Sequence, residues 1–236
     1  MFEYFKDNYV WDCAVIFALE MGAVMSEVDA ICSPLRSIAG SDTAKANDAW
    51  SSRWGAVGDQ LESQAQRDLD EGHQITAAEK FIRAAVYHLL AERVLPSRHK
   101  ARPGHYTRGL ELFDKGIALR RDPAELVAVP YGNHELPGIL YRAAGDSKSP
   151  CMIHFNGFDW IKEFSYLMLA EAYAERGISS LFVDQPGTGG ALRESGIPAR
   201  PERVAKDERS LPHCSRGGRD WVETHPSGHS VLADHR

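Results

Sequence analysis

Apolar residues recur every three or four positions through the first 120 residues, which is the spacing of helices with one buried face. The pattern runs from Phe5 to Met25 and again from Ala49 to Asp70. A third stretch, TAAEKFIRAAVYHLLAERVL (residues 76–95), has Thr76 as its predicted N-cap and ends before Pro96. The basic stretch SRHKARPGHYTR (residues 97–108) favours a solvated connection over a nucleic-acid patch, because aromatic residues do not interleave with its charges.

The period changes from about Glu125. LVAVPYG (126–132) and LPGILYRA (136–143) are short runs rich in β-branched and aliphatic residues, and they predict an antiparallel hairpin that turns at Gly132-Asn133. CMIHFNG (151–157) predicts a third strand, residues 164–176 an amphipathic helix, and ISSLFVD (178–184) a fourth strand. Strand, helix and strand in this order form a βαβ unit, which is typical of parallel sheets.

The chain loses its periodicity after Pro201. GRDWVETHP (218–226) is interpreted as the end of an amphipathic helix, and SGHSVLADHR (227–236) predicts no strand. The predicted fold class is therefore α/β: a helical domain (1–122), an incomplete sheet domain (123–200) and an irregular tail (201–236). Since no strand is expected after Asp184, the strand that ends there is predicted to have an open edge, which invites association.

Composition restricts the class of protein. The chain has 236 residues, of which 43% are hydrophobic and 25% charged, with a net charge of −6. These values are typical of a globular domain and favour neither nucleic acid nor an anionic membrane as partner. The apolar run at residues 13–25 is too short to span a bilayer and contains Glu20, so it predicts a buried helix.

The cysteines suggest a compartment. Cys13, Cys32, Cys151 and Cys214 form no CxxC pair and no metal-ligand spacing, which indicates reduced thiols in a cytoplasmic protein. We expect no metal and no cofactor. The expected partner is a small-molecule substrate, and the sequence leaves a homo-oligomer open.

One motif indicates chemistry. HFNGFD (154–159) ends an apolar strand and leads into a helix, so its backbone N–H groups are placed to stabilise an oxyanion. Gly157 and Phe158 are the predicted donors, and Asn156 and Asp159 are predicted to contact substrate. An ordinary strand-to-helix turn is the equally weighted alternative.

A second loop, DQPGTGG (184–190), follows the next strand, at the sheet edge where ligands bind in open α/β sheets. Its glycines lack the spacing of a dinucleotide motif, since Leu192 stands at the third glycine position. Gly187 and Gly189 are therefore predicted to shape the rim of a substrate pocket.

These motifs together resemble the α/β-hydrolases that have a helical N-terminal domain, such as 2,6-dihydroxypseudooxynicotine hydrolase and the FrsA-like esterases. The stretches that carry the resemblance are TAAEKFIRAAVYHLLAE, HFNGFDWIKE and LFVDQPGTGGALRESGIPAR. The resemblance implies a Ser-His-Asp hydrolase that cleaves either a carbon–carbon bond next to a ketone or an ester. It also implies that the helical domain covers the site and helps to choose the substrate.

The family's nucleophile elbow, Gly-x-Ser-x-Gly after a buried strand, has no good match here. Ser215 lies in HCSRGG and Ser230 in GHSVL, and neither follows an apolar strand. The late histidines, His225, His229 and His235, are interpreted as surface residues. We therefore expect a hydrolase-family chain whose serine, acid and base are missing and which is inactive as given.

Two other interpretations remain open: a non-catalytic binding or interaction module built on the helical domain, and a gene remnant without a stable product. The tail is interpreted either as the result of reading-frame shifts or as a natural disordered segment. Limited proteolysis is expected to begin after residue 200.

Overall fold

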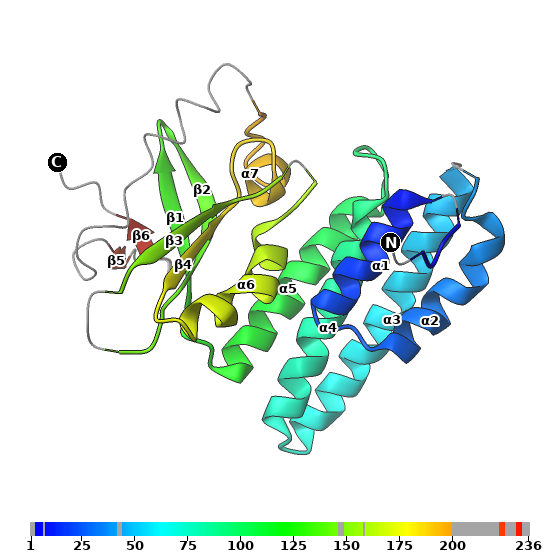
Figure 1. Cartoon of the computed structure of the whole chain (residues 1–236), viewed down its shortest axis with the longest axis horizontal. Helices are drawn as coiled ribbons and strands as arrows, with labels where there is room; N and C mark the ends of the chain where they lie inside the picture. The colour runs from blue at the N-terminus through cyan, green and yellow to red at the C-terminus, as the bar shows by residue number, and fades with distance from the viewer. Residues whose placement is uncertain are drawn as a thin grey trace. The chain divides into compact units, whose positions relative to one another are not determined.

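The structure is a computed structural model that describes residues 3–6, 8–41, 44–145, 149–157 and 159–199, and the backbone of residues 222–224 and 230–232. The chain divides into two compact units, Met1–Arg121 and Asp122–Arg236 (Figure 1). The first unit is helical and the second contains the sheet, as the hydrophobic pattern predicts.

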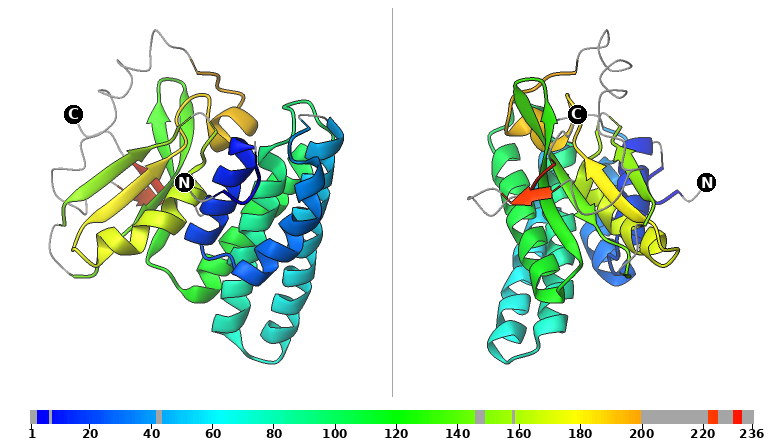
Figure 2. Two further views of the ribbon diagram at one scale, coloured as in Figure 1. Left: turned by 45° about the vertical axis from the view of Figure 1, so that its right-hand side comes forward. Right: turned by 90° about the vertical axis from the view of Figure 1, so that its left-hand side faces the viewer.

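The helical unit contains five α-helices and one 3₁₀ helix within its described residues: α1 (Tyr9–Glu20), α2 (Met25–Cys32), η1 (Ser33–Ile38), α3 (Ala44–Asp70), α4 (Gln74–Arg93) and α5 (Arg102–Arg120). Helices α3, α4 and α5 lie side by side (Figure 2). The buried residues of this unit include a cluster of aromatic rings. Rings contact one another from Trp11 through Trp50 and Trp54 to Tyr87, with centroids 4.8–5.3 Å apart, and all four side chains are buried.

Three local predictions for this unit were wrong. Helix α4 begins at Gln74 with His73 as its N-cap, so Thr76 lies inside the helix. The basic stretch is not only a connection, because residues 102–108 form the start of α5, where Pro103 is tolerated in the first turn. The apolar run at 13–25 is not one helix, because α1 ends at Glu20 and Gly22 follows with a φ of +90°. Among the described residues, no helix is long and apolar enough to cross a membrane.

The sheet unit starts with the predicted hairpin. Strands β1 (Ala124–Tyr131) and β2 (His134–Tyr141) pair antiparallel, and Tyr131 faces His134 across the turn. Strand β3 (Cys151–Phe155), helix α6 (Lys162–Ala174) and strand β4 (Ser179–Val183) form the predicted βαβ unit, with β3 and β4 as parallel neighbours. A short helix, α7 (Gly189–Arg193), follows β4.

Both faces of this sheet are covered, and alternate residues of β4 show it. Phe182 points toward the α6 side, where its ring contacts Tyr166. Leu181 and Val183 point to the opposite side and belong to a cluster that includes Ala191 and Ile197. All five residues of β4 are buried, including Ser179 and Ser180, as is typical of a strand covered on both faces.

Two predictions for the sheet are corrected by the strand order, β3-β4-β2-β1-β6-β5. Strand β4 has no open edge, because β2 pairs with it on one side and β3 on the other. The tail also contributes strands. Val222–Thr224 forms β5 where a helix end was predicted, and Ser230–Leu232 forms β6, which lies parallel to β1. Three-residue strands depend on pairing, and β6 pairs with β1 from the start of this unit, so a local pattern does not reveal them.

Candidate functional site

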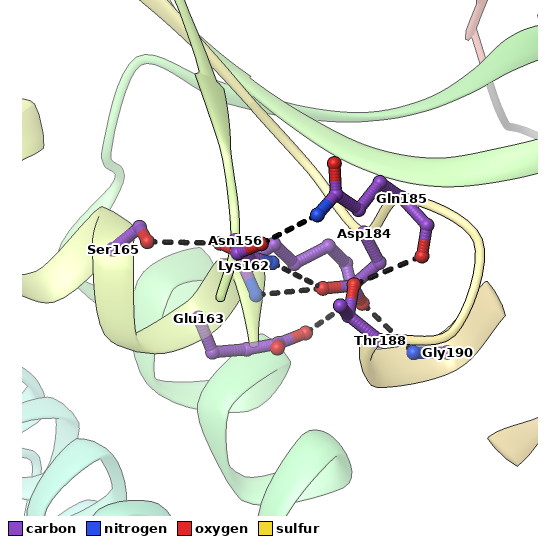
Figure 3. Close-up of polar contacts among 8 residues, drawn as sticks. All are labelled: Asn156, Lys162, Glu163, Ser165, Asp184, Gln185, Thr188 and Gly190. Atoms are coloured by element: carbon purple, nitrogen blue, oxygen red, sulfur yellow. Dashed lines mark hydrogen bonds and ion pairs between the residues drawn. The ribbon is translucent and has the colours of Figure 1, made fainter. Parts of the chain in front are cut away.

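The two motif loops meet at the carboxyl ends of β3 and β4. Asn156 directly follows β3 and Asp184 directly follows β4, and both side chains are buried. The Asn156 Nδ2 donates a hydrogen bond of 2.7 Å to Asp184 Oδ1. The Gln185 Nε2 donates to the backbone oxygen of Asn156 at 2.6 Å, which is a second hydrogen bond between the two loops. We call this set of contacts the Asp184 network; Figure 3 shows its eight residues, Asn156, Lys162, Glu163, Ser165, Asp184, Gln185, Thr188 and Gly190.

Asp184 connects the N-termini of two helices. Its Oδ1 accepts from the backbone N–H of Lys162, the first residue of α6, at 2.8 Å. Its Oδ2 accepts from the backbone N–H of Gly190 in the first turn of α7, also at 2.8 Å. The first N–H groups of a helix lack intrahelical partners, and the helix dipole favours negative charge there. One carboxylate that is completely buried therefore fixes where both helices begin.

A buried ion pair adjoins Asp184. The Lys162 Nζ lies 2.5 Å from Glu163 Oε1 and 3.4 Å from Asp184 Oδ2 (Figure 3). Burial raises the pKa of Glu163 to about 7; Lys162 opposes this shift and Asp184 adds to it. Among the described residues, the second oxygen of Glu163 has no hydrogen-bond partner. A carboxyl group with a pKa near neutrality can exchange a proton at physiological pH.

Gly187 and Gly189, which were predicted to shape the rim of a substrate pocket, lie where a larger side chain would not fit. Gly189 has a φ of +39°, and a Cβ there would lie 2.1 Å from the Asp184 carboxylate. Gly187 has a φ of +90°, and a Cβ there would lie 2.5 Å from the Cβ of Ala199. Both residues are buried. They let the 184–190 loop fold tightly around Asp184, and contact with substrate stays a prediction.

The predicted oxyanion turn is found where the sequence placed it, after β3. Gly157 and Asp159 are exposed, and a Cβ on Gly157 would meet no atom within 4 Å. Phe158, the second predicted donor, lies outside the described residues. Asn156 was predicted to contact substrate, but its side chain is buried in the network, where its Oδ1 accepts from Ser165 Oγ at 3.0 Å. The roles assigned to these residues stay predictions.

Sequence reasoning missed the centre of the site. Asp184 was identified only as the end of a strand, and Lys162 and Glu163 were not singled out. A usable signal was present, because an acidic residue directly after the apolar residues Leu181–Val183 lies at the carboxyl end of a strand, where ligands bind in open α/β sheets. The pairing of Asp184 with a helix that starts 22 residues earlier depends on tertiary contacts and has no local signature.

Ser230 lies far from this turn. The paired residues form a row across the sheet, Phe155, Val183, Gly138, Val127 and Ser230. Four steps between strands correspond to about 19 Å at the usual strand spacing of about 4.8 Å. Ser215 lies outside the described residues. The position of Ser230 therefore gives no support for a nucleophile beside Gly157.

Comparison with known proteins finds similarity to α/β-hydrolases. No family model matches the chain. The alpha/beta hydrolase ucsC of Acremonium sp is 28% identical over 203 residues, which cover 78% of this chain and 40% of that protein. The hydrolyase ccsE of Aspergillus clavatus is 26% identical over 187 residues, 72% of this chain and 43% of that protein. The chain thus spans about two fifths of the length of these relatives.

A solved structure shows the same fold. The crystal structure of the 2,6-dihydroxy-pseudo-oxynicotine hydrolase matches with a TM-score of 0.59 at 23% identity, over 73% of this chain and 46% of that one. The chain is therefore an α/β protein that resembles the α/β-hydrolase family. Its described elements are a helical unit followed by a mixed α/β sheet unit.

Proposed function

We propose that this chain carries the carbonyl-binding part of an α/β-hydrolase site. The observation that carries the proposal is the Asp184 network, which fixes the turn after β3 to the starts of α6 and α7. A turn held this way can present the backbone N–H groups of Gly157 and Phe158 at one position. Pre-organised donors of this kind stabilise an oxyanion, and each is worth about 10²–10³ in rate.

The proposed substrate is a small ketone or ester, cleaved by hydrolysis of a carbon–carbon or an ester bond. The names of the relatives support hydrolysis as the class of reaction. The distance of Ser230 from the turn supports a further proposal, that residues 1–236 alone give no serine-type turnover. Hydrolysis of an aryl ester should therefore be at background rate, and Ser215→Ala and Ser230→Ala should leave it unchanged. Activity that disappears in either variant would contradict this part of the proposal.

Carbonyl binding can be tested without turnover. We expect a small aryl ketone, added to the ¹⁵N-labelled full chain, to shift the backbone amide signals of residues 157–159 most strongly. Gly132, at the hairpin turn of the same unit, is the internal control and should not respond. Asp184→Asn should weaken ketone binding, because an amide has only one acceptor oxygen and cannot accept from the α6 and α7 backbone N–H groups on separate oxygens.

Two results would contradict this proposal. The proposed carbonyl site is wrong if the amide signals of residues 157–159 do not shift at ketone concentrations up to the solubility limit. Shifts confined to residues 1–121 would favour the alternative function, a non-catalytic binding module built on the helical unit.

A further inference from the structure

A second polar group lies in the helical unit, and the proposed hydrolase function does not use it. Asp59 and Glu62 are three residues apart on α3, so they share one face of that helix. His88 comes from the middle of α4. One ligand atom from each of these three residues lies within 4.8 Å of the other two.

His88 is the buried member of this group. Its side chain is 3% exposed, and its Nε2 has no hydrogen-bond partner among the described residues. The Asp59 Oδ1 lies 3.4 Å from this nitrogen, and the Asp59 side chain is 73% exposed. A buried polar atom without a hydrogen-bond partner is unfavourable. This nitrogen faces the Asp59 carboxylate, as a metal-binding imidazole nitrogen would face a second ligand. The exposed side of the group gives a hydrated cation access to it.

Two glycines of α3 make room for the imidazoles. A Cβ on Gly58 would lie 2.8 Å from His88 Nε2, and a Cβ on Gly55 would lie 2.5 Å from Cε1 of His105. Glycine inside a helix costs roughly 0.5–1 kcal/mol relative to alanine. The two imidazole rings can therefore pack this closely against α3 only because α3 carries glycine there.

His105, on α5, orients His88. The Nδ1 atoms of the two rings are 3.2 Å apart, so one ring donates a hydrogen bond to the other. When His88 Nδ1 is the donor, its Nε2 carries a lone pair directed at the carboxylate side. A hydrogen bond of this kind on the remote nitrogen is how proteins orient a metal-binding histidine.

We propose that His88, Asp59 and Glu62 bind a divalent transition-metal ion, with Zn²⁺ as the probe, and that His105 positions His88. Imidazole nitrogen and carboxylate oxygen are ligands that Zn²⁺ prefers, and three protein ligands leave a coordination position for water. Sequence spacing could not indicate this site, because its ligands come from two helices. The expectation of a metal-free protein rested on cysteine spacing, which does not bear on a histidine–carboxylate site.

Arg108 is the competitor for one ligand. Its guanidinium donates to both oxygens of Glu62, from Nε to Oε2 at 2.9 Å and from a terminal nitrogen to Oε1. A bound metal ion would therefore compete with the Arg108 guanidinium for the Glu62 carboxylate. Removing Arg108 should strengthen metal binding, and a damaged fold would not produce a change in that direction.

The test is titration of the untagged, chelator-treated full chain with Zn²⁺ by calorimetry and with Co²⁺ by visible absorption. We expect one ion per chain at this site. His88→Gln and Asp59→Asn should each weaken binding at least about 10-fold, and His105→Gln about 10-fold or more through loss of the positioning contact. Arg108→Gln should tighten binding. Circular dichroism spectra should show that the variants are folded.

A matched control lies in the same unit. His99 Nε2 lies 3.1 Å from Asp48 Oδ1, in a pair with both side chains partly exposed. His99→Gln should leave Zn²⁺ affinity unchanged. The proposal is wrong if the chain binds neither ion at millimolar concentration, if His88→Gln binds as tightly as the parent chain, or if His99→Gln has the larger effect.

Discussion

The two units of the chain bury charge in different ways. In the helical unit, buried carboxylates act singly: Glu92 pairs with Arg102, and Asp12 accepts from the backbone N–H groups of residues 4 and 5. In the sheet unit, three ionisable side chains, Lys162, Glu163 and Asp184, lie together with at most 6% exposure each. Burying adjacent charges is a poor way to gain stability, and such groups are common at functional sites. The difference indicates that apolar packing holds the helical unit, whereas the polar network of the sheet unit positions two loops.

The largest effect is expected in the aromatic core of the helical unit. Trp50 is completely buried, and its Nε1 donates to the backbone oxygen of Leu90 at 3.0 Å. Trp50→Ala should lower the free energy of unfolding by about 3–5 kcal/mol, because it leaves a large cavity. Denaturant unfolding followed by circular dichroism measures this, with Tyr9→Ala, at a residue 67% exposed, as the control. Equal effects of the two variants would show that the ring cluster is not the core of the unit.

A somewhat smaller effect is expected at Asp184. Asp184→Asn keeps the shape of the side chain but removes the charge that faces Lys162 and two helix N-termini, which should cost about 3 kcal/mol. Hydrogen exchange should show faster exchange at the amides of Lys162 and Gly190 than in the parent chain. Glu175→Gln, at an exposed carboxylate at the end of α6, is the control. If protection is lost in the helical unit instead, the comparison between the two units fails.

The third effect, similar in size to that at Asp184, concerns pH. The pKa of Glu163 is raised by burial from 4.5 to about 7, so folding favours its protonated form. This contribution to stability is complete below about pH 4.5 and is lost as the pH rises to about 7. Relative to Glu163→Gln, the parent chain should lose on the order of 3 kcal/mol across this window, since each pKa unit is worth about 1.4 kcal/mol. The pKa of about 7 already includes the opposing effect of Lys162. Unfolding curves of both proteins at several pH values measure it, and parallel curves would contradict the assignment.

Local pattern predicted those elements whose signal lies within a few consecutive residues. Gly132-Asn133 between two apolar runs was sufficient for the hairpin, and the apolar faces of α3 and α4 were sufficient for helices. Helix boundaries were less accurate, since α4 starts two residues before the predicted cap. The start of α5 was missed because arginine, proline and histidine there suggest a loop, while packing against α4 makes the segment helical.

The sequence by itself determined the two-part organisation, the βαβ unit and the place of the turn at Gly157, because hydrophobic period and turn residues are local properties. Only the tertiary structure decided the strand order, in which β4 has two neighbours. It also decided that residues 222–224 and 230–232 form strands. It also decided that Asp184 holds α6 and α7, and that Asp59 and Glu62 face His88. Most of these contacts join residues that are more than 20 positions apart, such as Asp184 with Lys162 and Asp59 with His88. Hydrogen bonds and charge pairing depend on distance in space, which the spacing of residues along the chain does not record.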